Sequence, residues 1–399
     1  MRIIDGKYAA AHVMTDDVEQ AAVDQIQNLV DSKAAEGSSV AIMPDVHAGK
    51  GCTIGTVMTV TDRVVPNLVG VDIGCSVYAY RLGKKDFEVD FENLQRVIDA
   101  FIPSGRKVHD GPVLGHRAFG FSGKFMMPVS KDQIQYLDRS VGTLGGGNHF
   151  ISIEVGESGA YLLIHSGSRN LGTMVARHYQ ELAVKNIRKV DNSKLIAELK
   201  AAGRHKEIAA ELAKVEVEVV DPDLAYLEGQ DAKNYLTDMA TAQLYAHLNR
   251  ETMANTIFYH MGWEYSGAIR TQHNYIDTER GILRKGAVAA YENEAFLVPL
   301  NMRDGTLIYM SEGENGPEWL DSAPHGAGRR KSRTKARAEG NLEEYKKSME
   351  GIWSASVNEA TLDENPNAYK DANSIIEILD KNFTKIDHLI PVFNFKANS

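Results

Sequence analysis

Hydrophobic and polar positions follow two different periods along this chain, and the segments with each period predict a mixture of helices and strands. Apolar residues recur at helical spacing from Thr15 to Val30, where the threonine and the acidic residues after it predict a capped amphipathic helix. Residues 176–217 and 232–259 show the same spacing. The first of these segments predicts two exposed helices broken near Gly203, and the second predicts a longer, more buried helical block.

Short apolar runs between the helical segments predict strands. The run Ser38–Met43 reads as a buried strand that ends at Pro44, and another apolar strand leads to the sequence VDIGC at 71–75. A basic stretch near residue 330 is expected to continue as a helix to about Ser354. The remaining expected strands are 150–155, 162–165, 271–276, 283–287, 295–300, 306–310 and 389–395. Because no linker or internal repeat separates these segments, we expect one domain over 1–399 with a helical insertion at 176–260.

Composition narrows the class of protein. A hydrophobic content of 43% with 25% charged residues is ordinary for a globular domain, and the net charge of −10 argues against nonspecific coating of nucleic acid. Two cysteines, Cys52 and Cys75, suit a reducing compartment. The N-terminus lacks a signal-peptide pattern, and the apolar stretch 64–80 is interrupted by proline, glycine and aspartate. We therefore expect a cytoplasmic protein with no membrane partner.

The first candidate for chemistry is His325, which lies on a turn of small residues ahead of a dense basic run. Gly326 and Gly328 leave no side chain beside the imidazole, so a bulky ligand can approach. Guanidinium groups pair with phosphate oxygens, and a neutral imidazole is a competent nucleophile toward phosphorus. The stretch predicts a nucleophilic histidine that handles a nucleotide; taken alone, it equally fits a turn followed by a solvated basic helix. The basic residues of the run are Arg329, Arg330, Lys331, Arg333, Lys335 and Arg337.

Candidate metal ligands lie beside glycines elsewhere in the chain. Asp72 and Cys75 are three residues apart, and carboxylate with thiolate suits a borderline metal such as Zn²⁺ or Mn²⁺. His149 and His165 lie at expected strand ends next to small residues, where metal ligands are often presented. Each feature alone also fits a structural role, such as a turn aspartate, a buried thiol or a core histidine.

Together these motifs resemble the RtcB family of RNA ligases. The matching stretches occur in the family's order over residues 44–371, and they are PDVHAGKG, VGVDIGC, GTLGGGNHF, HSGSRNLG, QHN, RKGA, HGAGRRKSR and NAYKD. The resemblance implies an α+β fold with extensive mixed β-sheets and surrounding helices. It also implies a GTP-dependent enzyme that joins an RNA 3′-phosphate or 2′,3′-cyclic phosphate end to a 5′-hydroxyl end. The implied route passes through a covalent GMP–histidine intermediate and a 3′-GMP-capped RNA.

The resemblance assigns roles to individual residues. His325 would be the guanylylated histidine, oriented by Asp45. The implied ligands of two Mn²⁺ ions, with Zn²⁺ possible in the isolated protein, are Asp72, Cys75, His149, His165 and His273, with Cys75 bridging. The implied nucleotide contacts are Asn148, Gly326, Ala327, Gly328, Arg329, Tyr369, which would stack on guanine, and Lys396. The implied contacts to RNA phosphate are Arg169, Arg333 and Lys285.

Two departures from the family pattern concern the guanine site. Ser152 stands where the family usually has a glutamate, and the segment Leu300–Gly305 replaces a Gly-Ser-Met-Gly sequence. These changes predict a relaxed preference for GTP over ATP, unless Glu154 or another group substitutes.

Two other function classes are open. A metal-dependent cyclic phosphodiesterase would not need His325, and a non-catalytic RNA-binding protein would be expected to lose metal ligands. Both are disfavoured because the histidine and all implied ligands are present.

Overall fold

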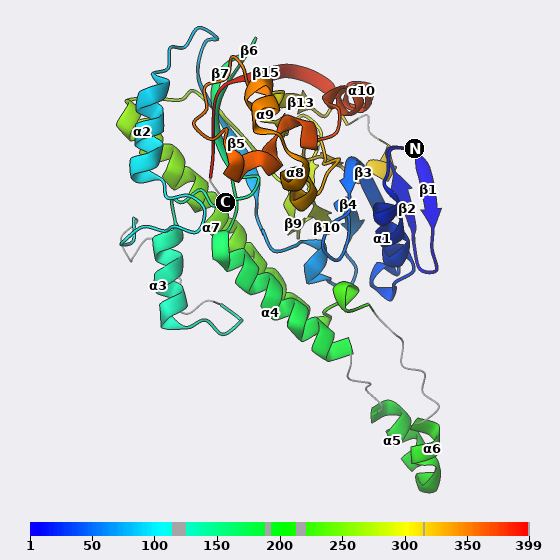
Figure 1. The fold of residues 1–399 in the computed structure, drawn as a ribbon. Helices are drawn as coiled ribbons and strands as arrows, with labels where there is room; N and C mark the ends of the chain where they lie inside the picture. The colour runs from blue at the N-terminus through cyan, green and yellow to red at the C-terminus, as the bar shows by residue number, and fades with distance from the viewer. Residues whose placement is uncertain (114–124, 188–192, 213–220, 314–315, 398–399) are drawn as a thin grey trace.

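The computed structural model describes residues 1–113, 125–187, 193–212, 221–313 and 316–397 (Figure 1). Three β-sheets form the centre of the molecule, and helices pack around them. This is the mixed α+β architecture expected from the sequence.

One sheet has six strands in the order β1-β2-β3-β4-β10-β9. Strands β2 and β3 run parallel, and the other neighbours are antiparallel, so the sheet is mixed. Its strands are β1 (Arg2–Asp5), β2 (Ala10–Val13), β3 (Val40–His47), β4 (Ile54–Thr59), β9 (Asn274–Asp277) and β10 (Ile282–Lys285).

The second sheet has seven strands in the order β12-β13-β15-β6-β7-β5-β8, all antiparallel to their neighbours. Its strands are β5 (Ser76–Gly83), β6 (Phe150–Gly156), β7 (Gly159–Ser166), β8 (Ala268–Gln272), β12 (Ala295–Asn301), β13 (Gly305–Met310) and β15 (Thr384–Lys396). The third sheet pairs β11 (Ala287–Ala289) with β14 (Ser322–Pro324), directly before His325.

Successive residues of β6, β7 and β15 face opposite sides of the large sheet. Ile151, Ile153 and Phe393 lie in a core cluster with residues of two covering helices, α2 (Phe91–Phe101) and α7 (Gly229–Met261). Phe150 and Leu163 lie in a smaller cluster on the other side. That second side also carries polar residues, and it faces the cavity described below.

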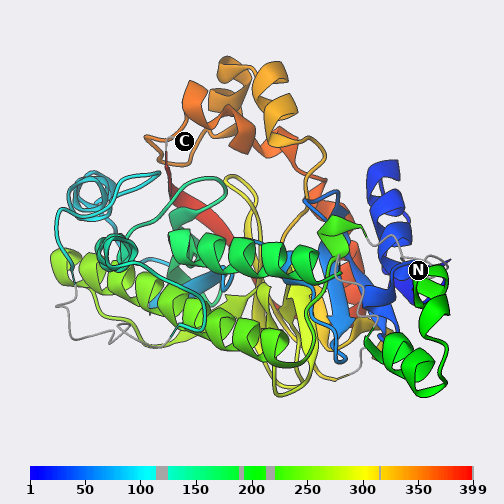
Figure 2. The same ribbon diagram turned by 90° about the horizontal axis from the view of Figure 1, so that it is seen from below.

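Helices α4 (Arg169–Ile187) and α7 run side by side along the molecule (Figure 2). The expected insertion at 176–260 includes most of these two helices, and both contribute buried residues such as Tyr179 and Tyr235 to the largest core cluster. Only α5 (Ser193–Ala201) and α6 (Ile208–Leu212) extend away from the body (Figure 1). The predicted break near Gly203 lies between them, whereas residues 188–192 and 213–217 of the two predicted helices lie outside the described residues. The prediction that these helices are exposed is wrong for α4, where Ala176, Tyr179 and Ala183 are buried.

Several element boundaries differ from the sequence-based expectation. Helix α1 spans Gln20–Val30 and does not begin at Thr15, because the Thr15 hydroxyl accepts from Asp17 N at 3.2 Å in a local turn. Strand β3 continues past Pro44 to His47, with an irregular register that accommodates the proline. The segment before Cys75 contains a 3₁₀ turn at Pro66–Leu68, so Asp72 and Cys75 lie on a loop leading into β5.

The C-terminal helices are shorter than expected. The helix predicted to extend to Ser354 is divided at Gly340 into α8 (Arg333–Glu339) and α9 (Leu342–Ser348). The other described helices are α3 (Lys131–Ser140) and α10 (Ala372–Asn382). Within the described residues, no helix combines the length and the apolar character needed to cross a lipid bilayer.

Candidate active site

A cavity of about 290 Å³ is lined by residues from the two large sheets and the loops between them. It brings together most residues singled out from the sequence, although they come from distant parts of the chain. These are Asp72, Cys75, Asn148, His165, His273, His325, Gly326, Ala327, Gly328, Arg329, Arg333, Tyr369 and Lys396.

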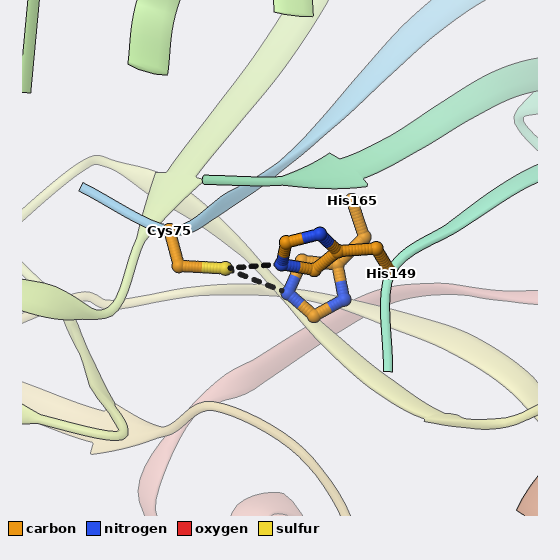
Figure 3. Close-up of side chains that lie close together, drawn as sticks. All are labelled: Cys75, His149 and His165. Atoms are coloured by element: carbon orange, nitrogen blue, oxygen red, sulfur yellow. Dashed lines mark hydrogen bonds between the residues drawn. The ribbon is translucent and has the colours of Figure 1, made fainter. Parts of the chain in front are cut away.

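Cys75, His149 and His165 form a compact cluster at the cavity wall (Figure 3). The Cys75 Sγ lies 3.5 Å from His149 Nε2 and 3.2 Å from His165 Nε2. Asp72 Oδ2 lies 2.9 Å from the same His149 nitrogen. A thiolate, two imidazoles and a carboxylate at these separations are a donor set suited to Zn²⁺ or Mn²⁺.

The backbone orients both imidazoles of this cluster. His149 Nδ1 lies 2.9 Å from Leu144 O, and His165 Nδ1 lies 3.2 Å from Asn148 O. A carbonyl accepts only from a protonated ring nitrogen, so these contacts place a proton on each Nδ1 and direct each Nε2 toward the thiol. The arrangement is that of metal ligands held by their second ring nitrogen.

The charges of the cluster favour a bound cation. Burial raises the pKa of the Cys75 thiol, and the Asp72 carboxylate adds to this effect. Burial lowers the pKa of His165 and of His273, so both imidazoles are neutral at pH 7. Burial opposes ionisation of Asp72, but His149 outweighs it and the pKa falls to about 2. A divalent cation would stabilise the thiolate against both burial and the carboxylate.

His273 connects this cluster to His325. It occupies the single residue between β8 and β9, and its ring centroid lies 5.2 Å from that of His165 and 4.9 Å from that of His325. A row of imidazoles thus leads from the thiol to the candidate nucleophile.

His325 is held against β3 by Asp45. The His325 Nδ1 lies 2.7 Å from Asp45 Oδ2, and the carboxylate is fully buried. The contact lacks the direction of an aligned hydrogen bond, so its contribution is mainly electrostatic. Gly328, at φ +76°, permits this approach, because a Cβ there would lie 2.5 Å from Asp45 O. Nε2 is then the ring nitrogen left for a ligand in the cavity.

Two buried carboxylates organise the basic residues beside the cavity, and sequence reasoning missed both. Glu364 contacts the Lys396 ammonium, accepts from the Tyr369 hydroxyl at 2.9 Å and accepts from Arg333. Asp363 Oδ2 accepts from Arg333 at 2.7 Å. Burial opposes ionisation of Glu364, but Lys396 and Arg333 lower its pKa to about 2. The signal available in the sequence was an Asp-Glu pair close before the NAYKD motif.

Arg250 is a third residue that the sequence did not single out. It lies fully buried in α7, donates to Gly74 O at 3.0 Å and to Ser166 O, and packs over the Tyr78 ring. These carbonyls flank Cys75 and His165, so Arg250 braces the loop and the strand end that carry them. An arginine within a helix predicted to be buried was the available signal.

Two of the residues expected to bind RNA phosphate lie outside the cavity lining. Arg169 donates from Nε to Thr143 Oγ1 and from one amino group to Gly105 O, and it packs against Gly145. Lys285 is buried, and its ammonium donates to Lys50 O at 2.7 Å and to Asn67 O at 2.8 Å. This placement argues against a phosphate contact for Lys285, because the chain already satisfies its ammonium in a site away from solvent.

Comparison with known proteins agrees with these motifs. The family model described as "tRNA-splicing ligase RtcB" matches residues 25–118 and 120–397. The chain is 29% identical to the RNA-splicing ligase RtcB of Escherichia coli K12 over 84% of this chain and 85% of that protein. It is 26% identical to the tRNA-splicing ligase RtcB of Archaeoglobus fulgidus over 91% of this chain and 88% of that protein. The tRNA-splicing ligase RtcB of Aeropyrum pernix is also 26% identical, over 84% of this chain and 83% of that protein.

The match to the family model covers the seven-stranded sheet, the six-stranded sheet from β3 onward, the Cys–His cluster and the turn that carries His325. The chain therefore belongs to the RtcB family.

Proposed function

We propose that this protein is a GTP-dependent RNA ligase, which joins an RNA 3′-phosphate or 2′,3′-cyclic phosphate end to a 5′-hydroxyl end. Membership of a family whose relatives are named RNA-splicing and tRNA-splicing ligases supports the ligase class. The observation that carries the finer mechanism is the pairing of His325 with buried Asp45 beside a Cys–His cluster.

In the first step, His325 Nε2 attacks the α-phosphorus of GTP. A P–N bond forms, the bond between the α-phosphorus and the bridging oxygen breaks, and pyrophosphate leaves. Asp45 holds the Nδ1 side of the ring and stabilises the positive charge that develops on the imidazole. The carboxylate also keeps Nε2 directed toward the cavity.

The GMP group is then transferred to the RNA 3′-phosphate. A phosphate monoester is a poor electrophile, because displacement would expel a very basic oxygen. The resulting anhydride has a good leaving group, so the 5′-hydroxyl oxygen attacks the RNA phosphorus and GMP departs. A cyclic phosphate end is first opened by water to the 3′-phosphate.

Asp72, Cys75, His149, His165 and His273 would hold the metal ions, for which Mn²⁺ is our proposal. The oriented Nε2 atoms and the adjacent thiol fit this role. The metals would neutralise phosphate charge and lower the pKa of an attacking hydroxyl.

The basic side of the cavity suits the phosphates of both substrates. Arg329, Arg333 and Lys396 line it, and Asn148 lies just before the start of β6. We assign Arg333 to RNA phosphate and the others to the nucleotide. Tyr369 also lines the cavity and presents an aromatic ring on which a base could stack.

The test is incubation with Mn²⁺ and α-labelled GTP, followed by isolation of an acid-labile protein–nucleotide adduct. We expect the adduct with the parent protein and with His260→Ala, a control histidine that lies exposed at the end of α7. His325→Ala should form none. An adduct of undiminished yield in His325→Ala would refute the assignment.

A second substrate separates ligation from simple cyclic phosphate hydrolysis. RNA that already carries a 3′-GMP cap bypasses the histidine step, because its leaving group is in place. His325→Ala should therefore fail on 3′-phosphate ends but seal the capped RNA to a 5′-hydroxyl in Mn²⁺. A parent protein that opens cyclic phosphates but joins neither RNA would instead be a phosphodiesterase.

A further inference from the structure

A row of four imidazoles runs from the candidate nucleophile across the metal-ligand cluster. The ring centroids of His325 and His273 are 4.9 Å apart, those of His273 and His165 are 5.2 Å apart, and those of His165 and His149 are 5.3 Å apart. The candidate nucleophile lies at one end of this row, and His149 lies at the other. The segment beyond His149 lies outside the cavity lining and has no role in the chemistry proposed above.

A tight turn, residues 104–107, packs against the segment that carries His149. The turn forms an isolated bridge with Gly145, and Gly105 N donates to Gly145 O at 2.8 Å. Gly145 is adjacent to the metal-site imidazole, because a Cβ added to this glycine would lie 2.8 Å from His149 Nδ1. The turn therefore lies beside the end of the row that is farther from the candidate nucleophile.

Arg169 holds this turn in place. Its guanidinium donates to Gly105 O at 2.9 Å and to Thr143 Oγ1 at 3.0 Å, so it links the turn to the segment that precedes His149. Gly105 has a φ of +65°, a left-handed conformation that glycine adopts without steric cost. The backbone of the turn is thus fixed relative to the metal-ligand cluster.

Arg106 and Lys107 are the two cations of this turn. Both side chains are exposed, and neither forms an ion pair or a hydrogen bond with the described residues. In contrast, Arg333 contacts buried carboxylates, and Lys331 pairs with Glu339. A protein with a net charge of −10 repels a polyanion over much of its surface, so an RNA strand binds where unpaired cations lie together.

The geometry of the sealing step determines which RNA strand passes this end of the row. In phosphoryl transfer, the attacking and leaving oxygens lie roughly in line on opposite sides of the phosphorus. GMP leaves on the side of the cavity that carries His325 and the assigned nucleotide contacts. The 5′-hydroxyl therefore approaches from the opposite side, where His149 and the turn lie.

We propose that Arg106 and Lys107 bind backbone phosphates of the RNA strand that carries the 5′-hydroxyl. This inference rests on the proposed function and names the surface that receives its second RNA end. Arginine and lysine side chains position a nucleic acid through its phosphate oxygens, and such contacts carry no information about base sequence. The surface accordingly binds the acceptor strand whatever its sequence.

The first test measures binding without turnover. A fluorescent single-stranded RNA with a hydroxyl group at each end is titrated with the protein in Mn²⁺, and fluorescence anisotropy is recorded at several salt concentrations. Arg106→Gln/Lys107→Gln should bind this RNA at least about tenfold more weakly at low salt. The slope of log K against log salt should fall in magnitude by about 1.4, because each phosphate contact to a single strand accounts for roughly 0.7.

The matched control is Lys84→Gln/Lys85→Gln, which removes the same charge from two adjacent exposed residues. This pair follows the end of β5 that is distant from Cys75, and at about 3.3 Å per residue it lies roughly 25 Å from that thiol. The control should keep the affinity and the salt slope of the parent protein. Parent affinity and slope in Arg106→Gln/Lys107→Gln, or an equal loss in both double variants, would overturn the proposal.

The second test identifies the strand. Sealing of 3′-GMP-capped RNA is measured while one strand is varied and the other is held in excess. In Arg106→Gln/Lys107→Gln, the half-saturating concentration of the 5′-hydroxyl strand should rise at least tenfold, and that of the capped strand should change less than twofold. An equal rise for both strands, or a rise for the capped strand alone, would overturn the assignment to the acceptor.

The two proposals fail in different ways. Salt-dependent binding of the 5′-hydroxyl strand through Arg106 and Lys107, without sealing by the parent protein, would refute ligation and leave the surface assignment intact. Sealing by Arg106→Gln/Lys107→Gln with the parent requirement for the acceptor strand would refute the surface assignment and leave ligation intact.

Discussion

Buried ionisable side chains lie where polar groups enclose the cavity. Cys75, His165 and His273 are each no more than 3% exposed, and charged and oriented polar groups lie beside them. Buried ionisable groups of this kind are common at functional sites, because burial shifts the protonation equilibrium on which the chemistry depends. The two cysteines illustrate the contrast. Cys52 is also buried, but its sulfur lies among threonine hydroxyls and away from the imidazoles.

Cys75→Ala should abolish metal binding and ligation, because the sulfur lies within 3.5 Å of the Nε2 atoms of both imidazoles. Changes in groups that only support metal ligands cost 10–100-fold, so the loss of a ligand should exceed roughly 100-fold in ligation rate. Metal content by mass spectrometry and ligation of 3′-phosphate RNA are the measurements. Cys52→Ala is the control and should retain its metal. Full metal occupancy and normal ligation in Cys75→Ala would show that the thiol is only a core residue.

Glu154 should give the protein an unusual dependence of stability on pH. Burial raises the pKa of this carboxyl from 4.5 to about 7, against weaker opposing hydrogen bonds from Ser152 and Thr306. In the unfolded chain the group ionises at lower pH, so the folded state loses stability as the pH rises through this interval. The full loss is roughly 3 kcal/mol, at about 1.4 kcal/mol per pKa unit.

The measurement is urea unfolding of metal-free protein, parent and Glu154→Gln, at several pH values from about 4.5 to 8. The difference between the two should grow in favour of the variant as the pH rises, since other titrating groups cancel. A difference independent of pH would mean that Glu154 ionises normally.

At the scale of elements, the cavity depends on an acidic 3₁₀ segment, Glu359–Glu364, that packs against α8. Its last two residues connect α8 to the end of β15, because Glu364 contacts both Arg333 and Lys396. The basic run was predicted to bind phosphate. Part of it instead forms ion pairs within the protein. This internal pairing fixes the positions of the guanidinium groups before any substrate binds.

Glu364→Gln should destabilise the protein by about 3–5 kcal/mol, because it leaves the buried Lys396 ammonium without its carboxylate. Thermal unfolding measures this effect, and nucleotide binding should fall with it. Glu339→Gln is the control: Glu339 is exposed and pairs with Lys331 at the surface, so its replacement should leave the melting temperature nearly unchanged. Equal effects of the two substitutions would contradict a structural role for Glu364.

In the whole molecule, the helices differ in how much they contribute to the buried core. Helices α4 and α7 supply many buried residues, and α7 contributes residues to two core clusters, one at each large sheet. Helices α5 and α6 extend away from this body (Figure 1). Stability should therefore be sensitive to changes in α4 and α7 and insensitive to changes in α5 and α6.

Replacement of residues 193–212 by a short Gly/Ser linker should preserve the fold and adduct formation. Because loop closure depends only weakly on length, the melting temperature should change by no more than about 3 °C. In contrast, Tyr179→Ala in α4 removes a fully buried aromatic ring and should cost about 3–5 kcal/mol. Calorimetry compares the two. Failure of the shortened protein to fold would show that α5 and α6 belong to the cooperative unit.

Elements whose signals are local could be predicted from the sequence alone. The alternation in 150–155 and the long periodicity of 232–259 predicted β6 and α7 closely. Residue types also singled out Cys75, His149, His165 and His325 as candidates, because few side chains bind metal ions or attack phosphorus. Local signals failed at the start of α1, where a threonine turn competed with the helix.

Which of these residues meet depends on contacts between segments that are distant in the sequence. Asp45 reaches His325 from the other end of the chain, and Glu364 reaches Lys396 across an intervening helix. Whether a charged side chain faces a cavity or a carbonyl depends on strands that are distant in sequence, as the buried contacts of Lys285 show. Periodicity places a side chain on a face, but burial and long-range pairing determine what that face encloses.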